Sequence, residues 1–105
     1  NANFDNDRIR ALVRESLMRQ PPEGYARSCD ALSEAQAVDV HDLKCPTLLV
    51  TGDEDQIAPT QSVRLLGERI SGARVEVLSR CGHWQTYEKP EACVDSLKRF
   101  YAQRI

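Results

Sequence analysis

The chain has 105 residues, of which 41% are hydrophobic and 29% are charged, and its formal net charge is −2. This composition is typical of one small globular domain. Because the charge balance provides no basic surface and no apolar run is long enough to cross a bilayer, we expect neither a nucleic-acid nor a membrane partner. No charged-then-apolar leader opens the chain, so we expect no targeting segment. The four cysteines form no C-x-x-C pair, which indicates reduced thiols and predicts a cytoplasmic protein.

Two helices are predicted before the first strand. Residues 3–20 carry apolar side chains at helical spacing, after a start rich in Asp and Asn that can cap the first turn. The Pro-Pro pair at 21–22 stops this helix and can begin another, whose apolar residues share one face. The helical period is then lost, so we place a boundary near Val40, between a helical segment (1–40) and a second unit (41–105).

The second unit opens with a short apolar strand and an acidic turn. Leu48 to Val50 form an apolar run without alternation, which is typical of a strand covered on both faces in a parallel sheet. Gly52 breaks the pattern and is followed by three carboxylates, those of Asp53, Glu54 and Asp55. In sheets of this kind the chemistry sits at the carboxyl ends of the strands. We therefore expect the functional site at this turn.

A helix, a second strand and a last helix are predicted after the acidic turn. The first helix begins near Pro59 and ends at Ser71-Gly72. Residues 74–78 alternate polar and apolar, as a strand does when one face is more exposed to solvent. Pro90 begins the last helix. The inward face of the first helix is expected to be Val63, Leu66 and Ile70, and that of the last Cys93, Leu97, Phe100 and Tyr101. The order strand, helix, strand, helix predicts an α/β fold.

A carboxylate and a histidine follow the two predicted strands. Asp55 lies in the turn after the first strand, and His83 follows the second. Two strands joined by a helical crossover are parallel, so their carboxyl ends lie at the same edge of the sheet and these two residues can meet. A carboxylate beside a histidine holds the imidazole in one tautomer and stabilises its charged form. The sequence therefore predicts Asp55 as the orienting acid and His83 as a general base.

Other residues near these turns have simpler interpretations. Asp53 and Glu54 are predicted to be solvated turn formers, since Asp can hydrogen-bond its own backbone in a turn. Trp84 can line a substrate pocket, although an aromatic side chain at such a position is more often packing. His41 precedes the first strand and is predicted to be a loop residue.

Zinc and a cysteine nucleophile are alternatives based on residue type alone. The zinc-ligand types nearest the strands are His41, Cys45, Cys81 and His83. The first pair precedes one strand and the second pair follows its neighbour, so roughly 17 Å separates them at about 3.3 Å per residue. Zinc bonds are about 2.0 to 2.3 Å long, so we expect no metal site. Cys81 has the residue type of a thiol nucleophile for His83, but two positions apart on one loop they are expected to point away from each other.

Residues 46–59 (PTLLVTGDEDQIAP) and Gly82-His83-Trp84, with Glu88 and Pro90 after them, resemble the C-terminal part of an α/β-hydrolase-fold enzyme. In that family the acid ends a G-x-x-D turn and the histidine follows a glycine, which implies Asp55 and His83 as two members of a catalytic triad. The resemblance covers residues 43–105, and the acid precedes the histidine as in the family's chain order. No cofactor is implied.

A weaker resemblance concerns the first part of the chain. Residues 22–29 (PEGYARSC) resemble 3-oxoadipate enol-lactonases and meta-cleavage-product hydrolases. The helical pair resembles the end of the cap that is inserted over such active sites.

The nucleophile of this family is not in the sequence, because no segment matches the G-x-S-x-G elbow that carries it. Ser62 and Ser79 lack flanking glycines and are expected to be surface hydroxyls. We expect the nucleophile in a missing N-terminal half, which is either absent or present as another chain. One hypothesis is part of a serine-type hydrolase that acts on a small ester, lactone or C–C bonded diketone. The other is a non-catalytic fragment or interaction module that pairs through its open sheet edge.

Overall fold

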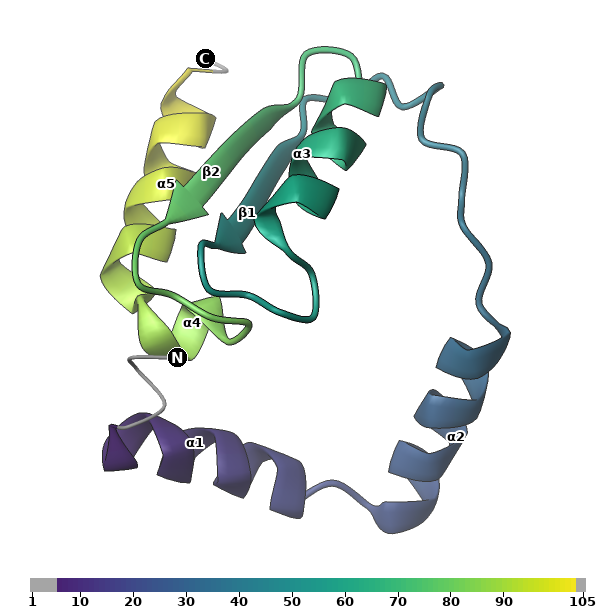
Figure 1. Cartoon of the computed structure of the whole chain (residues 1–105), viewed down its shortest axis with the longest axis vertical. Coiled ribbons are helices and arrows are strands. Elements are labelled where there is room, and N and C mark those ends of the chain that lie inside the picture. Colours follow the sequence, from purple (N-terminus) through teal and green to yellow (C-terminus); the bar gives the residue numbers. More distant parts are fainter. Residues whose placement is uncertain (1–5, 104–105) are drawn as a thin grey trace.

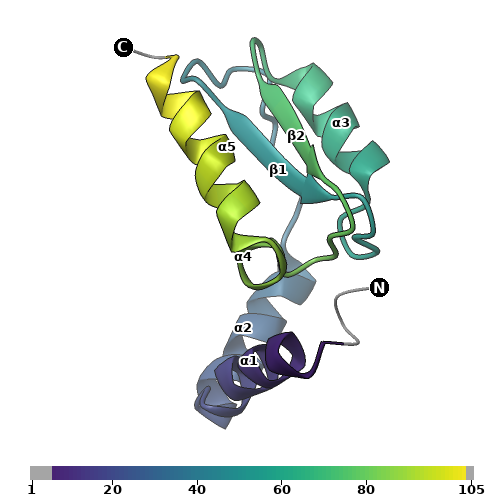
Figure 2. The ribbon, with the colours of Figure 1, turned by 90° about the vertical axis from the view of Figure 1, so that its left-hand side faces the viewer.

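Two parallel strands joined by a helical crossover form the centre of the molecule. In the computed structural model, which describes residues 6–103, the elements follow the order α1 (Asp7–Met18), α2 (Pro22–Glu34), β1 (Leu48–Gly52), α3 (Thr60–Arg69), β2 (Arg74–Leu78), α4 (Gln85–Glu88) and α5 (Pro90–Ala102). The register pairs Leu48 with Arg74 and Gly52 with Leu78. Figure 1 shows that both strands point toward α4, and Figure 2 shows α3 and α5 on opposite faces of the sheet. The predicted α/β fold with parallel strands is confirmed.

Local sequence signals explain where the helices begin. The Asn6 side chain caps α1 by accepting a hydrogen bond from the Arg8 N–H at 2.9 Å. Pro22 and Pro90 occupy the first turns of α2 and α5, where a missing N–H costs no hydrogen bond. The helix predicted over residues 3–20 is therefore confirmed in part, since α1 ends at Met18 and residues 3–5 lie outside the described part of the chain.

The buried core is small and partly polar. Its hydrophobic members are Ile9, Val13, Ile70, Leu78 and Cys81, and its polar members are Thr51, Asp55, Glu88 and Ser96. Helices lie on both faces of the sheet, as predicted, but the apolar run of β1 is only half-buried. Two strands form too narrow a sheet to cover the helices that pack on it.

The predicted inward faces of the helices are also less buried than expected, because the sheet is narrow. Leu66 on α3 is 37% exposed, while Ile70 just after that helix is buried. On α5, Leu97 and Tyr101 are 46% and 64% exposed, and Ser96 is the buried residue. These apolar side chains follow the helical period as predicted, but Leu66, Leu97 and Tyr101 are left exposed within the described residues.

The helical pair lies beyond the carboxyl ends of the strands (Figure 1). Helix α1 contacts α4, and Ile9 and Val13 on α1 are buried. Helix α2 buries no residue, although its apolar side chains share a face. Residues 35–47 connect α2 to β1 without a helix or a strand. The boundary near Val40 falls in this connection and stays a prediction.

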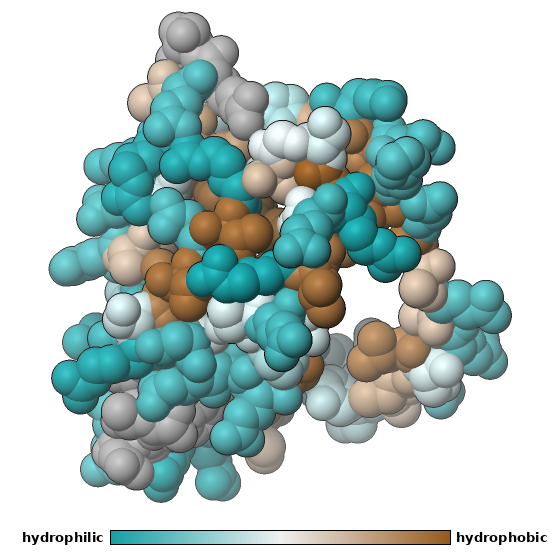
Figure 3. Space-filling view, turned by 45° about the horizontal axis from the view of Figure 1, so that its top comes forward, coloured by the Kyte–Doolittle hydropathy of each residue, from teal (hydrophilic) through white to brown (hydrophobic). Residues whose placement is uncertain are grey.

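Hydrophobic side chains gather in the middle of the face shown in Figure 3 and are surrounded by hydrophilic ones. The exposed large apolar residues of the sheet-packing helices are Leu65, Leu66, Val94, Leu97 and Tyr101. Within residues 6–103, no helix combines the length and the apolar character that a transmembrane span requires.

Candidate active site

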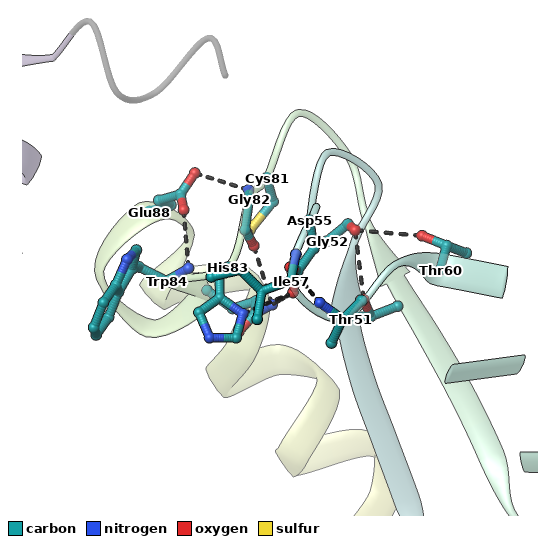
Figure 4. A network of polar contacts seen from close by, with 12 residues as sticks. Thr51, Gly52, Asp55, Ile57, Thr60, Cys81, Gly82, His83, Trp84 and Glu88 are labelled. Carbon is teal, nitrogen blue, oxygen red and sulfur yellow. Dashed lines mark hydrogen bonds and ion pairs between the residues drawn. The ribbon is translucent and has the colours of Figure 1, made fainter. Parts of the chain in front are cut away.

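The loop between β1 and α3 holds Asp55 through backbone hydrogen bonds. Asp55 Oδ1 accepts from the N–H groups of Ile57 and Ala58, each at 2.9 Å. Thr51 Oγ1 donates to the Ala58 carbonyl at 3.3 Å, and Thr60 Oγ1 donates to the Gly52 carbonyl at 3.3 Å, so the loop is tied to its own ends (Figure 4). The backbone of its own loop therefore orients the Asp55 carboxylate, independently of its side-chain contacts.

The loops after β1 and β2 are hydrogen-bonded to each other. The Asp53 N–H donates to the Leu78 carbonyl at 3.0 Å, and the Glu54 N–H donates to the Cys81 carbonyl at 2.8 Å. Gly52 is required where the loops approach, since a Cβ built there would lie 2.2 Å from the Cys81 carbonyl oxygen. The two loops behave as one structural unit.

Two predicted turn formers have further contacts. Asp53 is exposed, but its Oδ1 also accepts a hydrogen bond from the Cys81 N–H at 3.1 Å, which with the backbone of Arg80 lowers the pKa of Asp53. Glu54 Oε2 is buried and has no hydrogen-bond partner within residues 6–103. Both residues lie in the turn as predicted, but the prediction is incomplete for Asp53, and Glu54 is half-buried and not fully solvated.

Asp55 and His83 are in direct contact. His83 Nδ1 lies 3.1 Å from Asp55 Oδ2, and the side chains of His83 and Asp55 are 39% and 2% exposed. Burial raises the pKa of Asp55, but hydrogen bonds from the Ala58 N–H, from His83 and from the Ile57 N–H outweigh it and bring the pKa below its ordinary value. Asp55 is thus a carboxylate at neutral pH. This geometry makes Nδ1 the proton-bearing nitrogen of a neutral His83 and leaves Nε2 as the basic one.

A buried carboxylate holds the backbone on both sides of His83. Glu88 is 6% exposed, and its Oε1 and Oε2 accept hydrogen bonds from the N–H groups of Gly82 and Trp84 at 2.9 and 3.0 Å. Figure 4 shows both bonds. The sequence analysis included Glu88 in the resemblance but assigned it no role. A Glu two residues before a helix-starting Pro, five residues after His83, was the available signal.

Gln85 also contacts the site, and sequence reasoning missed it. Its Nε2 donates to Asp55 Oδ2 at 3.2 Å and to the Gly82 carbonyl at 3.0 Å. Gln85 begins α4, which has only four residues and therefore shows no helical period in the sequence.

Trp84 packs beside the histidine. The ring centroids of Trp84 and His83 are 5.8 Å apart in an edge-to-face arrangement. The ring centroids of Trp84 and Tyr87 are 6.2 Å apart. These contacts are typical of aromatic packing. A role for Trp84 in binding substrate stays a prediction.

Cys81 is enclosed between the loops. It is fully buried, its thiol donates to the Gly82 carbonyl at 3.6 Å, and burial, followed by the charge of Glu88, raises its pKa to about 12. A neutral thiol is a poor nucleophile. His41 and Cys45 are exposed and precede β1. Within residues 6–103, no group of three or more His, Cys, Asp or Glu side chains is arranged to hold a metal ion.

Serines do not complete the site within the described residues. Ser62 on α3 and Ser79 after β2 are exposed, as predicted. Within residues 6–103, the His83 ring forms a hydrogen bond with Asp55 and none with a serine.

Comparisons with known proteins find similar hydrolases, although no protein-family model matches the chain. A 2-hydroxymuconate semialdehyde hydrolase from Pseudomonas sp. (strain CF600) is 36% identical over 80 residues, which are 76% of this chain and 28% of that protein. The crystal structure of an enol-lactonase from Burkholderia xenovorans LB400 matches with a TM-score of 0.84 and 26% identity, over 94% of this chain and 38% of the lactonase.

A thermophilic esterase from Thermogutta terrifontis has the same fold. It matches with a TM-score of 0.93 and 24% identity, over 98% of this chain and 39% of the esterase. The chain thus spans about a third of the length of the proteins it matches. With its parallel strands and the loops that follow them, the chain has the fold of the C-terminal part of an α/β-hydrolase-fold enzyme.

Proposed function

We propose that this chain supplies the acid, Asp55, and the histidine, His83, of the catalytic triad of a serine-type α/β hydrolase. The contact of 3.1 Å between Asp55 Oδ2 and His83 Nδ1 carries the proposal. A buried, ionised carboxylate bonded to Nδ1 fixes the imidazole tautomer, which is the role of the acid in such triads. The similarity to a semialdehyde hydrolase and to an enol-lactonase supports the reaction class.

In the proposed mechanism His83 transfers one proton in each half of the reaction. A serine outside this chain attacks the carbonyl carbon of the substrate, and Nε2 of His83 takes the serine proton as the bond forms. Asp55 stabilises the imidazolium by its charge and remains ionised. His83 then gives this proton to the leaving group as its bond to the carbonyl carbon breaks. Next, a water molecule attacks the acyl carbon and gives a proton to the same nitrogen, and His83 returns that proton to the serine oxygen as the acid product leaves. These steps require no cofactor.

Substrates of this enzyme are small molecules with a carbonyl group, and we place them among small esters, lactones and C–C bonded diketones. The names of the similar proteins, a semialdehyde hydrolase and an enol-lactonase, support this range. In the complete enzyme, residues 1–40 would form the end of a cap over the site, and Trp84 would line the pocket. The position of α1 and α2 beyond the carboxyl ends of the strands supports the cap assignment. The predicted cytoplasmic location belongs to the same proposal.

The nucleophile-bearing part is the partner that this function requires, within the same polypeptide or as another chain. The second candidate function is an interaction module without catalysis, and the two-stranded sheet favours it because each strand has one edge unpaired within residues 6–103. In both candidates the open strand edge would pair with another segment, but only the hydrolase requires Asp55 to be ionised.

Asp55→Asn distinguishes the two. The test uses an assembled enzyme, in which this chain replaces the corresponding part of the Burkholderia enol-lactonase, with hydrolysis of a lactone as the readout. Since the substitution removes the charge and the tautomer control, we expect kcat to fall by about 10⁴-fold with KM little changed. Asp95→Asn on the exposed face of α5 is the matched control. Equal turnover in a folded Asp55→Asn enzyme would refute the hydrolase and leave the module.

A further inference from the structure

One amide nitrogen connects the two loops of the site. Gln85 Nε2 donates one hydrogen bond to Asp55 Oδ2 at 3.2 Å and another to the Gly82 carbonyl at 3.0 Å. Asp55 belongs to the loop after β1, and Gly82 is the residue before His83 in the loop after β2. The two N–H groups of a single side-chain amide therefore join the acid to the backbone that carries the histidine.

The bonds to Asp55 are divided between its two oxygens. Oδ1 accepts from the backbone of Ile57 and Ala58, and Oδ2 accepts from His83 and Gln85. The backbone bonds hold the carboxylate within its own loop, whereas the bond from Gln85 holds it toward the loop of His83. Rotation of the carboxylate about its Cβ–Cγ bond would break bonds at both oxygens.

We propose that Gln85 is a positioning residue that keeps Asp55 Oδ2 aligned with His83 Nδ1 while the histidine gains and loses its proton. A catalytic effect of Gln85 rests on the proposed function, whereas the alignment of Asp55 with His83 can be measured in this chain alone. Both acceptors that Gln85 contacts are oxygens, so the position requires a donor with two hydrogens on one atom. Glutamine meets this requirement, and glutamate, which has only acceptors at neutral pH, does not.

The alignment is tested in the 105-residue chain by NMR with ¹⁵N-labelled histidine. The chain has two histidines, His83 and His41, and the exposed His41 is an internal reference. At pH 8.5 the ring ¹⁵N shifts report which nitrogen carries the proton, and we expect His83 to be mainly the Nδ1–H tautomer. Gln85→Met keeps the length of the side chain but not its donors, and Gln85→Glu places an oxygen against two acceptors. We expect the Nδ1–H fraction of His83 to decrease in Gln85→Met and to decrease further in Gln85→Glu.

Gln61→Glu on the exposed face of α3 makes the same charge change away from the site and should leave both histidines unchanged. Far-UV circular dichroism establishes that each variant is folded, and Gln85→Met provides the result if Gln85→Glu unfolds. An unchanged His83 tautomer in folded Gln85→Met would overturn the inference.

The assembled enzyme separates this inference from the proposed function. Because misplaced catalytic groups cost up to about 100-fold, we expect Gln85→Met to lower kcat by about 10-fold and to change KM by less than about 2-fold. A shifted tautomer with an unchanged kcat would overturn the catalytic part of the inference. Failure of Asp55→Asn to lower kcat would instead refute the proposed function and leave the NMR result valid.

Discussion

Asp55 and His83 are 28 residues apart in sequence, yet Asp55 Oδ2 and His83 Nδ1 lie 3.1 Å apart. The parallel pairing of β1 and β2 brings their two loops to one edge of the sheet. Hydrogen bonds between the loops, from Asp53 N–H to Leu78 and from Glu54 N–H to Cys81, then fix the distance. The contact thus depends on the backbone structure of the two loops as well as on the two side chains.

Glu88 is expected to stabilise the loop that carries His83. Replacing Glu88 with Ala leaves the N–H groups of Gly82 and Trp84 without the acceptors they have now. Each unsatisfied buried donor costs about 1–3 kcal/mol, so we expect the loss of both to lower the free energy of unfolding by about 2–6 kcal/mol. Glu88→Gln keeps one acceptor and should lose about half as much.

Urea denaturation measures this loss, with Glu91→Ala as the control. Glu91 is likewise a glutamate, but it is exposed in the first turn of α5, so the loss in Glu91→Ala should stay within about 0.5 kcal/mol. Equal losses for Glu88→Ala and Glu91→Ala would contradict the role assigned to Glu88.

Asp55 is expected to make stability depend on pH in the acid range. Its pKa is lower in the folded chain than its ordinary value of 3.8, so folding releases protons from this group and stability rises with pH. The contribution is fully present above the unfolded pKa, and it is lost as the pH falls through the folded pKa. Asp55→Asn should therefore reduce the slope of the unfolding free energy against pH below about pH 4.

Urea denaturation between pH 3 and pH 6 gives this slope. The slope should not vanish, because hydrogen bonds also lower the pKa of Asp53. Asp95→Asn, an exposed change on α5, serves as the control. A slope in Asp55→Asn equal to that of the unsubstituted chain would show that Asp55 is not stabilised as a carboxylate.

Gly52 and Gly24 are expected to respond oppositely to Ala. A Cβ at Gly52 would meet the Cys81 carbonyl oxygen at 2.2 Å, and the backbone cannot yield there without separating the loops. We expect Gly52→Ala to cost at least about 3 kcal/mol. Gly24 lies in α2 with its nearest atom at 3.9 Å, so Gly24→Ala should strengthen this helix by up to about 1 kcal/mol.

Thermal unfolding followed by circular dichroism compares the two glycine variants directly. The ¹⁵N NMR signal of the Nδ1–H tautomer of His83 should be lost in Gly52→Ala and kept in Gly24→Ala. A stable Gly52→Ala chain that keeps the tautomer would contradict the close approach of the loops.

The sequence predicted the parts of this structure that depend on local pattern and on strand order. The apolar run before Gly52, the proline-led helices and the parallel crossover were sufficient to place Asp55 beside His83. Helix α4 was not predicted, because four residues show no period, and the partners of Gln85 and Glu88 are set by how that short helix folds back.

Burial was predicted less well than secondary structure. Helical spacing identified the apolar face of α5, but Leu97 is 46% exposed, because burial depends on the width of the sheet beneath the helix. Conversely, a spacing argument had no means of finding Ser96, which is 1% exposed. The burial of polar residues such as Asp55 and Glu88 depends on how the loops and α4 pack together, which is a property of tertiary structure.

Covalent labelling of the nucleophile tests the central claim, that His83 oriented by Asp55 is the general base of a serine hydrolase. The assembled enzyme is treated with a fluorophosphonate, which reacts with activated serines, and the adduct is followed over time by intact-mass spectrometry. Since an unactivated serine is a weak nucleophile, we expect His83→Ala to slow labelling by at least about 100-fold and His41→Ala to leave it unchanged. Equal labelling rates in folded His83→Ala and the unsubstituted enzyme would contradict the account.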